Sequence, residues 1–467
     1  MSDLTTPAPA LDPTTATLAK AEAAGAHPTE LAALRRRLEQ LTQSDAGQLA
    51  GAELTPLPDL PRLDELPAPS EQQARSVLDR LVVVKLNGGL GTSMGLSGPK
   101  SLLQVKPGMS FLDIFTTQVL ALREQYAARL PLLLMNSPST RGPALEALAR
   151  HPGTRDNGPV PLDFLQGREP KLRESDHQPV EWPANPELEW CPPGHGDLYT
   201  ALTASGVLDA LLDAGVRWCF VSNADNLGAV PDARLAAWIA DQGVPFTMEA
   251  VRGTPADRKG GHLAEHHGRT VLRETAQVPA GDDSFTDVER WRWYNTNNLW
   301  IDLQGLRELQ ADDPGGPALP LIVNRKTVDP SDPSSTPVIQ LETAMGAAIG
   351  SIDGARAVHV PRTRFAPVKT TDDLLVVRSD AYELTADGRL APAFDGPPPV
   401  VSLDRDVYRL LPDFEQRFPA GAPSLRRCDR LTVEGDVVFG AGVVCEGDVL
   451  VQGPRRVADG EVLRGPA

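Results

Sequence analysis

The chain is poor in the residues that build metal centres and cross-links. It has four cysteines in 467 residues, and none of them forms a CxxC pair. That spacing excludes a cysteine-based zinc site and a disulfide framework, and it favours reduced thiols in a cytoplasmic protein. Positive charge is also scarce, with 45 lysines and arginines against 62 acidic residues. We expect no nucleic-acid partner, because such binding depends on clustered cations that neutralise phosphates.

Long hydrophobic runs are missing as well. No stretch reaches the roughly eighteen apolar residues that cross a bilayer, so we expect no membrane partner. The first residues are acidic, polar and rich in alanine and proline, which does not match a secretory signal. A hydrophobic share of 41% is nevertheless sufficient for a large core, and the length predicts two or three domains.

Glycine, by contrast, is concentrated in one loop after an apolar strand. Residues 81–101 read LVVVKLNGGLGTSMGLSGPKS, with five glycines between positions 88 and 98. Glycine lets the backbone approach a ligand closely, and Lys100 adds a cation, so this glycine loop (residues 87–98) predicts a phosphate cradle. A P-loop is excluded because Pro99 precedes Lys100. A dinucleotide fingerprint is excluded because Gly95 stands one position too late.

Apolar strands alternate with helical patterns from about residue 81 to residue 384. This rhythm predicts an α/β fold with a mostly parallel sheet and flanking helices, in which ligands bind beyond the carboxyl ends of the strands. Asp225 follows one of these strands and is a candidate Mg²⁺ ligand, although an Asx turn explains the sequence SNADN equally well. The predicted elements are helices over 15–41, 111–126, 198–212 and 232–241, and strands over 132–135, 217–222 and 244–251.

Composition divides the chain into three predicted parts. Residues 1–75 hold a segment expected to be disordered to about residue 14, then helices, then a proline-rich connector over 54–69. Residues 76–390 form the catalytic part. Residues 391–467 carry the repeats EGDV at 434–437 and at 446–449, twelve positions apart. Twelve is two hexapeptide turns, which predicts rungs of a parallel β-helix, with ordinary hairpins as the alternative. A stack this short needs a neighbour, so it is a candidate surface for homo-oligomers.

Three further motifs combine polar residues with a strand or helix terminus. The loop PPGHGD at 192–197 opens a helix and presents backbone N–H groups that suit an anion or a base edge. Lys369 stands before the next helical pattern, and a lysine there suits a phosphate or is simply solvated. The run NTNNLW at 295–300 offers asparagine amides, which can donate to and accept from sugar hydroxyls, or cap a strand entrance.

Together with KGG at 259–261, ETAQVP at 274–279 and QLETAMGAAI at 340–349, these motifs resemble the eukaryotic-type UTP–glucose-1-phosphate uridylyltransferases, also called UDP-glucose pyrophosphorylases. The matching pieces follow the family order and cover roughly residues 80–380. The resemblance implies a Rossmann-like, GT-A-like nucleotidyltransferase core with a mixed, mostly parallel sheet and a small C-terminal left-handed β-helix. It also implies UTP and glucose 1-phosphate as substrates, with Mg²⁺ as the cofactor.

The same resemblance implies roles for individual residues. The metal ligand would be Asp225, and Lys100 and Lys369 would be the catalytic cations. The nucleotide would be bound by Leu86, Gly88, Gly89, Gly91, Thr92, Gln166, Gly196 and Asn223, with Gln166 reading the uracil. The sugar would be bound by His195, Gly261, Glu274, Asn295 and Asn297. The chain departs from the family pattern at His262, where we expect a small or hydroxylated residue.

Two alternatives share these motifs. One is a pyrophosphorylase of broad UDP-sugar or UDP-N-acetylhexosamine specificity, which a panel of sugar 1-phosphates would separate. The other is a catalytically inactive, nucleotide-sugar-binding regulator, which would bind UTP without releasing pyrophosphate.

Overall fold

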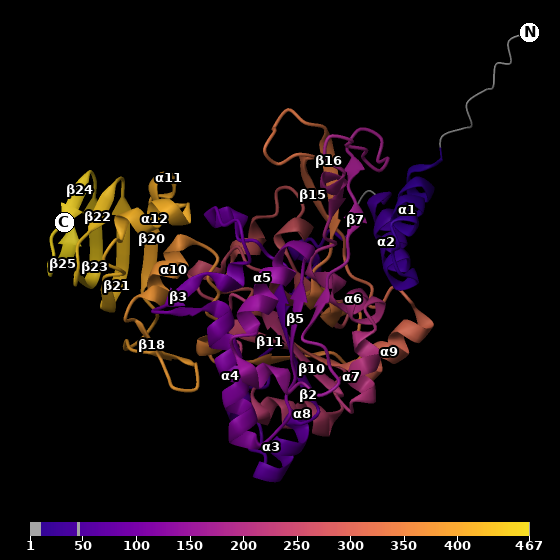
Figure 1. The fold of residues 1–467 in the computed structure, drawn as a ribbon, viewed down its shortest axis with the longest axis horizontal. Coiled ribbons are helices and arrows are strands. Elements are labelled where there is room, and N and C mark those ends of the chain that lie inside the picture. The colour runs from indigo at the N-terminus through magenta and orange to yellow at the C-terminus, as the bar shows by residue number, and fades with distance from the viewer. Residues whose placement is uncertain (1–10, 44–46, 467) are drawn as a thin grey trace, which may run out of the picture.

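The computed structural model of the chain describes residues 11–43 and 47–466. The disorder expected before residue 15 falls mainly on residues 1–10, outside the described residues. The predicted N-terminal helices are confirmed as α1 (Pro13–Ala23) and α2 (Pro28–Leu41). They form a pair at one end of the molecule, and the C-terminal strands lie at the other (Figure 1).

A ten-stranded mixed sheet forms the centre of the molecule. Its main path runs β1 (Thr55–Pro56), β12 (His262–His266), β14 (Trp293–Asp302), β10 (Trp218–Asn223), β2 (Leu81–Asn87), β5 (Leu132–Asn136) and β6 (Asp163–Leu165). The other strands are β11 (Phe246–Arg252), β13 (Arg269–Arg273) and β17 (Arg356–His359). The pairs β10–β2, β2–β5 and β5–β6 are parallel, whereas β14 runs antiparallel to β10 and β11. "Mostly parallel" therefore holds for one half of the sheet only.

Strand β2 shows why this sequence makes a sheet that is covered on both faces. Leu81 and Val83 belong to one hydrophobic core, and Val82 and Val84 belong to the core on the opposite face. Side chains alternate across a strand, so a continuous apolar run is expected only where helices cover both sides. The first core includes residues of α3 (Glu71–Leu78), α4 (Phe111–Tyr126), α5 (Pro138–Leu148) and α8 (Ala233–Gln242). The second includes residues of α6 (Leu198–Ala204), α7 (Val207–Asp213) and α9 (Leu303–Asp312).

Helix boundaries follow the capping residues. Ser110 accepts from the backbone N–H of Asp113, and the carboxylate of Asp113 accepts from that of Ser110, which confirms the predicted start of α4. The single helix expected over 198–212 is wrong. It is two helices, α6 (Leu198–Ala204) and α7 (Val207–Asp213), separated at Gly206. Gly206 has φ of 72°, a left-handed conformation that ends the first helix.

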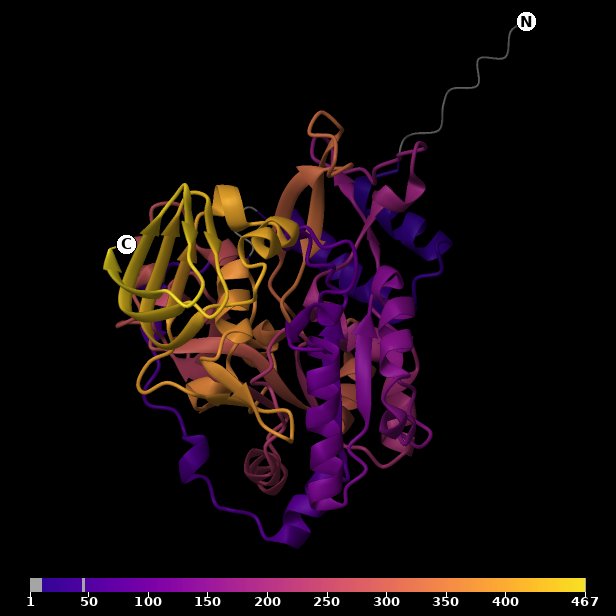
Figure 2. The ribbon, with the colours of Figure 1, turned by 60° about the vertical axis from the view of Figure 1, so that its left-hand side comes forward.

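The C-terminal part is built of parallel strands. One sheet holds β20 (Val400–Leu403), β21 (Ser424–Glu434), β23 (Val444–Gln452) and β25 (Val462–Pro466), and a second pairs β22 (Val437–Phe439) with β24 (Arg455–Val457). Figure 2 shows these strands stacked beside one another. Their core is continuous with Met94 and Phe111 of the central part.

The register corrects the predicted rung length. Leu431 lies opposite Val449, and Val444 lies opposite Val462, so residues eighteen positions apart are neighbours. The two EGDV sequences, twelve apart, do not stack: Glu434 pairs with Gln452. Three hexapeptides, rather than two, separate equivalent positions. Within the described ranges, no helix is long and apolar enough to cross a membrane.

Candidate active site

The glycine loop begins where β2 ends, at the carboxyl edge of the parallel half of the sheet. Gly91 and Gly95 have φ of 63° and 73°, and they bracket a short 3₁₀ turn at Thr92–Met94. The buried side chain of Met94 fixes this turn, whereas Thr92 is exposed. The backbone N–H of Lys100 donates to the carbonyl of Gly89 at 3.1 Å and closes the loop. The loop therefore has the glycine-lined form expected of a phosphate cradle.

The predicted base-binding residues come from the ends of β10, β2 and β6, with β5 between the last two in the parallel half of the sheet. Leu86 of β2 lies beside Asn223 of β10 in the sheet register. Gln166 follows β6, and its backbone N–H donates to the carbonyl of Asn136 at 2.8 Å. A Cβ atom at Gly88 would lie 2.2 Å from Oε1 of Gln166, so a larger residue there would displace the carboxamide of Gln166. The structure thus brings Leu86, Gly88, Gln166 and Asn223 together at one sheet edge.

The PPGHGD loop is held by the segment that carries QLETAMGAAI. The N–H of Gly196 donates to the carbonyl of Thr343 at 2.8 Å, and a Cβ at Gly196 would lie 2.3 Å from Oγ1 of Thr343. Packing against Thr343 therefore explains this glycine, and its N–H is not free for a base. Nδ1 of His195 accepts from the N–H of Met345 at 3.0 Å, which leaves Nε2 to carry the proton of the neutral ring. Burial, and then the charge of Lys369, lower the pKa of His195 to about 4.

The predicted sugar-binding residues also converge. A Cβ at Gly261 would lie 2.5 Å from Oε1 of Glu274, so Glu274 packs directly on this glycine. Asn295 donates from Nδ2 to Oδ1 of Asn297 at 2.8 Å, and Asn297 has φ of 57°. Gly346, next to the partner of His195, lies against the amide of Asn295, where a Cβ would be 3.0 Å from Nδ2. Burial raises the pKa of Glu274, and the charge of Lys369 partly offsets this.

His262, which departs from the family pattern, belongs to the packing around this group. Its ring is fully buried and stacks on Trp291 with centroids 4.9 Å apart. Burial lowers the pKa of His262 to about 3, so the ring is neutral. It acts as an aromatic core residue beside Gly261.

The two predicted cations approach the predicted metal ligand in different ways. Nζ of Lys100 donates to Oδ2 of Asp225 at 2.5 Å, and both side chains are mostly buried. Lys369 is exposed, but the preceding residue, Val368, donates its N–H to the carbonyl of Asp225 at 3.2 Å. Lys100, Asp225 and Lys369 therefore lie in one region.

Asp225 retains an oxygen that fits a divalent cation. Its Oδ1 is buried and has no hydrogen-bond partner among the described residues. A buried acceptor without a donor is costly, and Mg²⁺ needs only one or two protein carboxylates when phosphate oxygens and water complete its octahedron. No group of three or more His, Cys, Asp or Glu in the described part of the chain could hold a metal by itself. The donor set fits an ion that arrives with a phosphate ligand.

Sequence reasoning missed the buried network that supports Lys369. The carboxylate of Glu249 on β11 accepts hydrogen bonds from both Nε and Nη2 of Arg364, at 2.8 and 2.5 Å. Asn298 and Trp300 of the NTNNLW motif donate to the same carboxylate at 3.0 Å each. The motif therefore has two sides. Asn298 and Trp300 point to Glu249, whereas Asn295 and Asn297 lie with the predicted sugar-binding residues. The sequence did offer one signal: Glu249 is a charged residue inside the apolar pattern of residues 246–251.

Asn226 links this network to the metal ligand. Its Nδ2 donates to Oδ1 of Asn298 at 3.1 Å, and its Oδ1 accepts from the N–H of Ala366 at 2.9 Å. The segment from Arg364 to Lys369 is therefore bonded to the turn that follows β10 and to Asn298 of β14.

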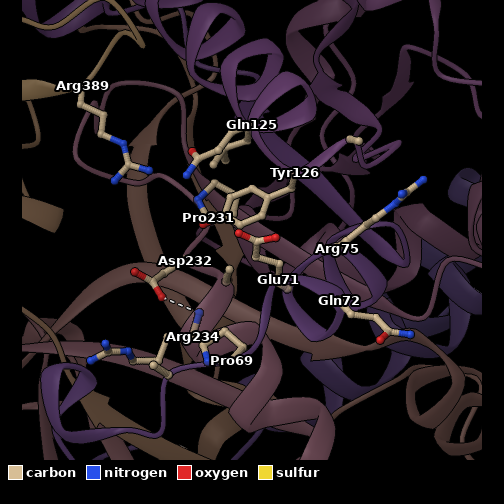
Figure 3. Close-up of a pocket in the computed structure, with 15 residues that line it drawn as sticks. Pro69, Glu71, Gln72, Arg75, Gln125, Tyr126, Pro231, Asp232, Arg234 and Arg389 are labelled. Carbon is tan, nitrogen blue, oxygen red and sulfur yellow. Dashed lines mark hydrogen bonds between the residues drawn. The ribbon is translucent and has the colours of Figure 1, made fainter.

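A separate groove of about 890 Å³ lies between α3, the end of α4 and the start of α8 (Figure 3). It contains none of the predicted site residues. Of its charged residues, Asp232 caps α8 by accepting from the N–H of Arg234 at 2.8 Å. This groove is therefore separate from the predicted active site.

Comparison with known proteins decides the family. The family model "UTP--glucose-1-phosphate uridylyltransferase" matches residues 33–446. The chain belongs to this uridylyltransferase family. It is 40% identical to the UTP–glucose-1-phosphate uridylyltransferase of Solanum tuberosum, over 85% of this chain and 81% of the relative. It is 40% identical to that of Saccharomyces cerevisiae, over 81% of this chain and 76% of the relative.

Solved structures of the uridylyltransferase family match over nearly the whole chain. A UDP-glucose pyrophosphorylase mutant from Leishmania major, in complex with UDP-glucose, superposes with a TM-score of 0.92 and 40% identity, covering 98% of this chain and 99% of that one. A UDP-glucose phosphorylase from Trypanosoma brucei gives a TM-score of 0.89 and 42% identity, covering 97% and 99%. The α/β fold with its mixed sheet is therefore the family's own.

Proposed function

We propose that this chain is a UTP–glucose-1-phosphate uridylyltransferase, which transfers UMP from UTP to glucose 1-phosphate and releases pyrophosphate. One observation carries the proposal. The glycine loop with Lys100, the base-side residue Gln166 and the sugar-side residues Glu274 and Asn295 all face the same edge of the central sheet. Curated relatives at about 40% identity carry the name of this enzyme.

The reaction is a direct in-line displacement. A phosphate oxygen of glucose 1-phosphate attacks the α-phosphorus of UTP, the bond from that phosphorus to the bridging oxygen breaks, and its electron pair leaves with pyrophosphate. No protein nucleophile is needed, so catalysis consists of positioning and of stabilising negative charge. Lys100 supplies charge next to the glycine loop, and Lys369 holds the phosphate of the sugar. His195 can donate from Nε2 to the sugar because its Nδ1 is engaged by Met345.

Mg²⁺ fits this site at Asp225, whose buried Oδ1 has no donor among the described residues. When bound, the ion would neutralise charge on the phosphates of UTP. Lys100 already neutralises the other carboxylate oxygen, so Asp225 carries little excess charge before the nucleotide arrives.

The test is pyrophosphate release by the purified protein with UTP, Mg²⁺ and one sugar 1-phosphate at a time. Release with glucose 1-phosphate, reduced about 10²–10³-fold in Lys100→Ala, is the expected result. Asp225→Ala should abolish the Mg²⁺-dependent activity. Activity of Lys100→Ala within about threefold of wild type would remove this lysine from catalysis.

The panel also separates the alternatives. Comparable rates with galactose 1-phosphate and N-acetylglucosamine 1-phosphate would favour a broad UDP-sugar enzyme. Tight UTP binding without pyrophosphate release from any sugar would favour an inactive regulator. The presence of Lys100, Asp225 and Lys369 in one region argues against the second.

The remaining features of the chain support further parts of the proposal. We assign residues 1–75 to an N-terminal helical segment and connector, 76–390 to the catalytic domain and 391–467 to a left-handed parallel β-helix. The eighteen-residue register of the C-terminal strands supports a helix with three hexapeptide sides per coil. Four free, buried cysteines support a cytoplasmic location. Strand β25 is at an edge of its sheet, and a second copy of the chain would add there.

A further inference from the structure

Polar contacts fasten the N-terminal helices to the strand that leads to the PPGHGD loop and to the segment that follows α9. Lys20 of α1 donates to the carboxylate of Glu189 at 2.5 Å, directly before strand β9 (Trp190–Cys191). Arg36 of α2 binds both carboxylate oxygens of Asp313 at 2.5 Å, and Gln40 donates to the carbonyl of Leu319 at 3.1 Å. Figure 1 shows both helices beside strand β7 (Glu169–Pro170).

The most buried of these contacts is between Arg37 of α2 and Glu169. Nη2 of Arg37 donates to Oε2 of Glu169 at 2.6 Å, and the two side chains are 9% and 2% exposed. Glu169 lies opposite Cys191 in the two-stranded ladder of β7 and β9. This ladder begins three residues after Gln166 and ends four residues before His195. Arg37 therefore holds the two-stranded ladder that joins the loop of Gln166 to the loop of His195.

A second contact from α2 reaches the residue next to Gln166. A Cβ at Gly167 would lie 2.7 Å from Oε1 of Glu30. The N–H of Gly167 donates to Oδ2 of the buried Asp197 at 2.5 Å. Gly167 thus lies between a carboxylate of α2 and the carboxylate at the start of α6. The hydrogen bond to Asp197 fixes the backbone on the C-terminal side of Gln166, and the side chain of Glu30 lies against it.

Base selection by a glutamine requires that fixed backbone. A carboxamide has an acceptor at one end and a donor at the other, and a half-turn about its last bond exchanges them. Uracil presents an N–H and a carbonyl on its pairing edge, whereas cytosine presents the reverse order, a ring nitrogen and an amino group. A loosely held glutamine can satisfy either base. A glutamine held in one place, against Gly88, can be restricted to one.

We propose that α2 belongs to the nucleotide-binding site, with Arg37 as a positioning residue that acts through Glu169 to hold Gln166 in the orientation that selects uracil over cytosine. This inference rests on the proposed function, which gives Gln166 the base. Arg37 itself touches no substrate. The pair is incompletely satisfied, because Nε of Arg37 and Oε1 of Glu169 have no partner among the described residues. Such a pair contributes little net stability, which suits a role in positioning.

The test compares UTP with CTP in initial-rate assays at saturating glucose 1-phosphate. Arg37→Met should raise the KM for UTP, leave the KM for glucose 1-phosphate unchanged and reduce the UTP-to-CTP ratio of kcat/KM about tenfold, a usual scale for coupling through a shared contact. Arg37→Lys keeps the charge and should recover part of the ratio. Arg35→Met is the matched control, because Arg35 is on the same helix and exposed. It should retain the wild-type ratio.

Gln166→Ala separates the failure of this inference from the failure of the proposed function. If Gln166→Ala loses the preference and a folded Arg37→Met keeps it, the inference is overturned and the function stands. If Arg37→Met does not fold, the double variant Arg37→Met/Glu169→Gln removes both charges at once. A wild-type ratio in that variant overturns the inference. If the wild type makes no UDP-glucose, the proposed function fails, and calorimetric affinities for UTP and CTP in the same variants still decide the role of Arg37.

Discussion

Among the described residues, two buried arginine–glutamate pairs lie near the site, and they are built differently. Glu249 accepts four hydrogen bonds: two from Arg364, one from Asn298 and one from Trp300. Glu169 accepts one, from Arg37, and its Oε1 is left without a partner among the described residues. Burial raises the pKa of Glu169 to about 7, and the nearby carboxylates of Asp197 and Glu342 add to this against the effect of Arg37.

The difference separates two uses of a buried charge. A fully bonded carboxylate fixes the elements around it, and the pair of Glu249 joins β11, β14 and the segment that leads to Lys369. A carboxylate that accepts one hydrogen bond holds its loop by that contact alone, and it can become neutral by binding a proton. We therefore expect the Arg364–Glu249 pair to be required for folding. We expect the Arg37–Glu169 pair to adjust the position of the nucleotide-binding residues.

Glu249→Ala is expected to have the largest effect. It leaves the guanidinium of Arg364 buried without its counter-ion and frees two further donors, so the free energy of unfolding should fall by about 3–5 kcal/mol. Urea titration followed by tryptophan fluorescence would measure it. A loss below about 1 kcal/mol would show that the network adds little, and would make the two pairs equivalent.

Arg37→Met should cost less, about 1–3 kcal/mol, because Glu169 can take up a proton when its partner is removed. The loss should be larger at pH 8 than at pH 6, since keeping that proton is harder at the higher pH. The same titrations at the two pH values would measure this. An equal loss at both would mean that Glu169 stays ionised without Arg37.

Glu169→Gln tests the sign of the pH dependence. The folded pKa of Glu169, about 7, is raised above the ordinary value of 4.5, so the folded state binds more protons between these two values. Its contribution to the free energy of unfolding therefore falls as pH rises from 4.5 through 7. The variant lacks the carboxyl, so its stability should decline less than that of wild type across this window. A parallel decline in both proteins would contradict the assignment.

Arg325→Ala gives the smallest expected effect and sets the baseline. Arg325 and Glu174 form an ion pair at 2.8 Å with both side chains exposed, at 66% and 41%. Solvent screens such a pair, so the free energy of unfolding should change by no more than about 0.5 kcal/mol. A loss as large as that of Arg37→Met would mean that burial does not distinguish these pairs.

The sequence was most informative where chemistry is local. Strand β2, the capping of α4 by Ser110 and the glycine loop are each specified by neighbouring residues, and each formed as predicted. The base-side and sugar-side residues were assigned by family resemblance, and the structure brings Gln166 against Gly88 and Glu274 against Gly261. Their roles toward substrate remain predictions.

The rest depends on contacts between distant residues. The N–H and the missing Cβ of Gly196 are both explained by Thr343, 147 positions later, and the approach of Gly196 to a base stays a prediction. Arg37 and Glu169 carry no motif, and only folding places them together. The EGDV repeat suggested a twelve-residue rung because similarity along a chain does not reveal which residues pair across strands.

The eighteen-residue register has a consequence for how the C-terminal stack can change over evolution. Val437 lies opposite Arg455 just as Val444 lies opposite Val462, so the eighteen-residue spacing recurs in both sheets, apart from the register shifts at 424–430 and 446–449. Removing or inserting one whole eighteen-residue repeat preserves the inward and outward alternation of the strands that follow, whereas a change of one or three residues moves their interior side chains to the surface. Chain length in this region is therefore expected to vary in units of eighteen residues.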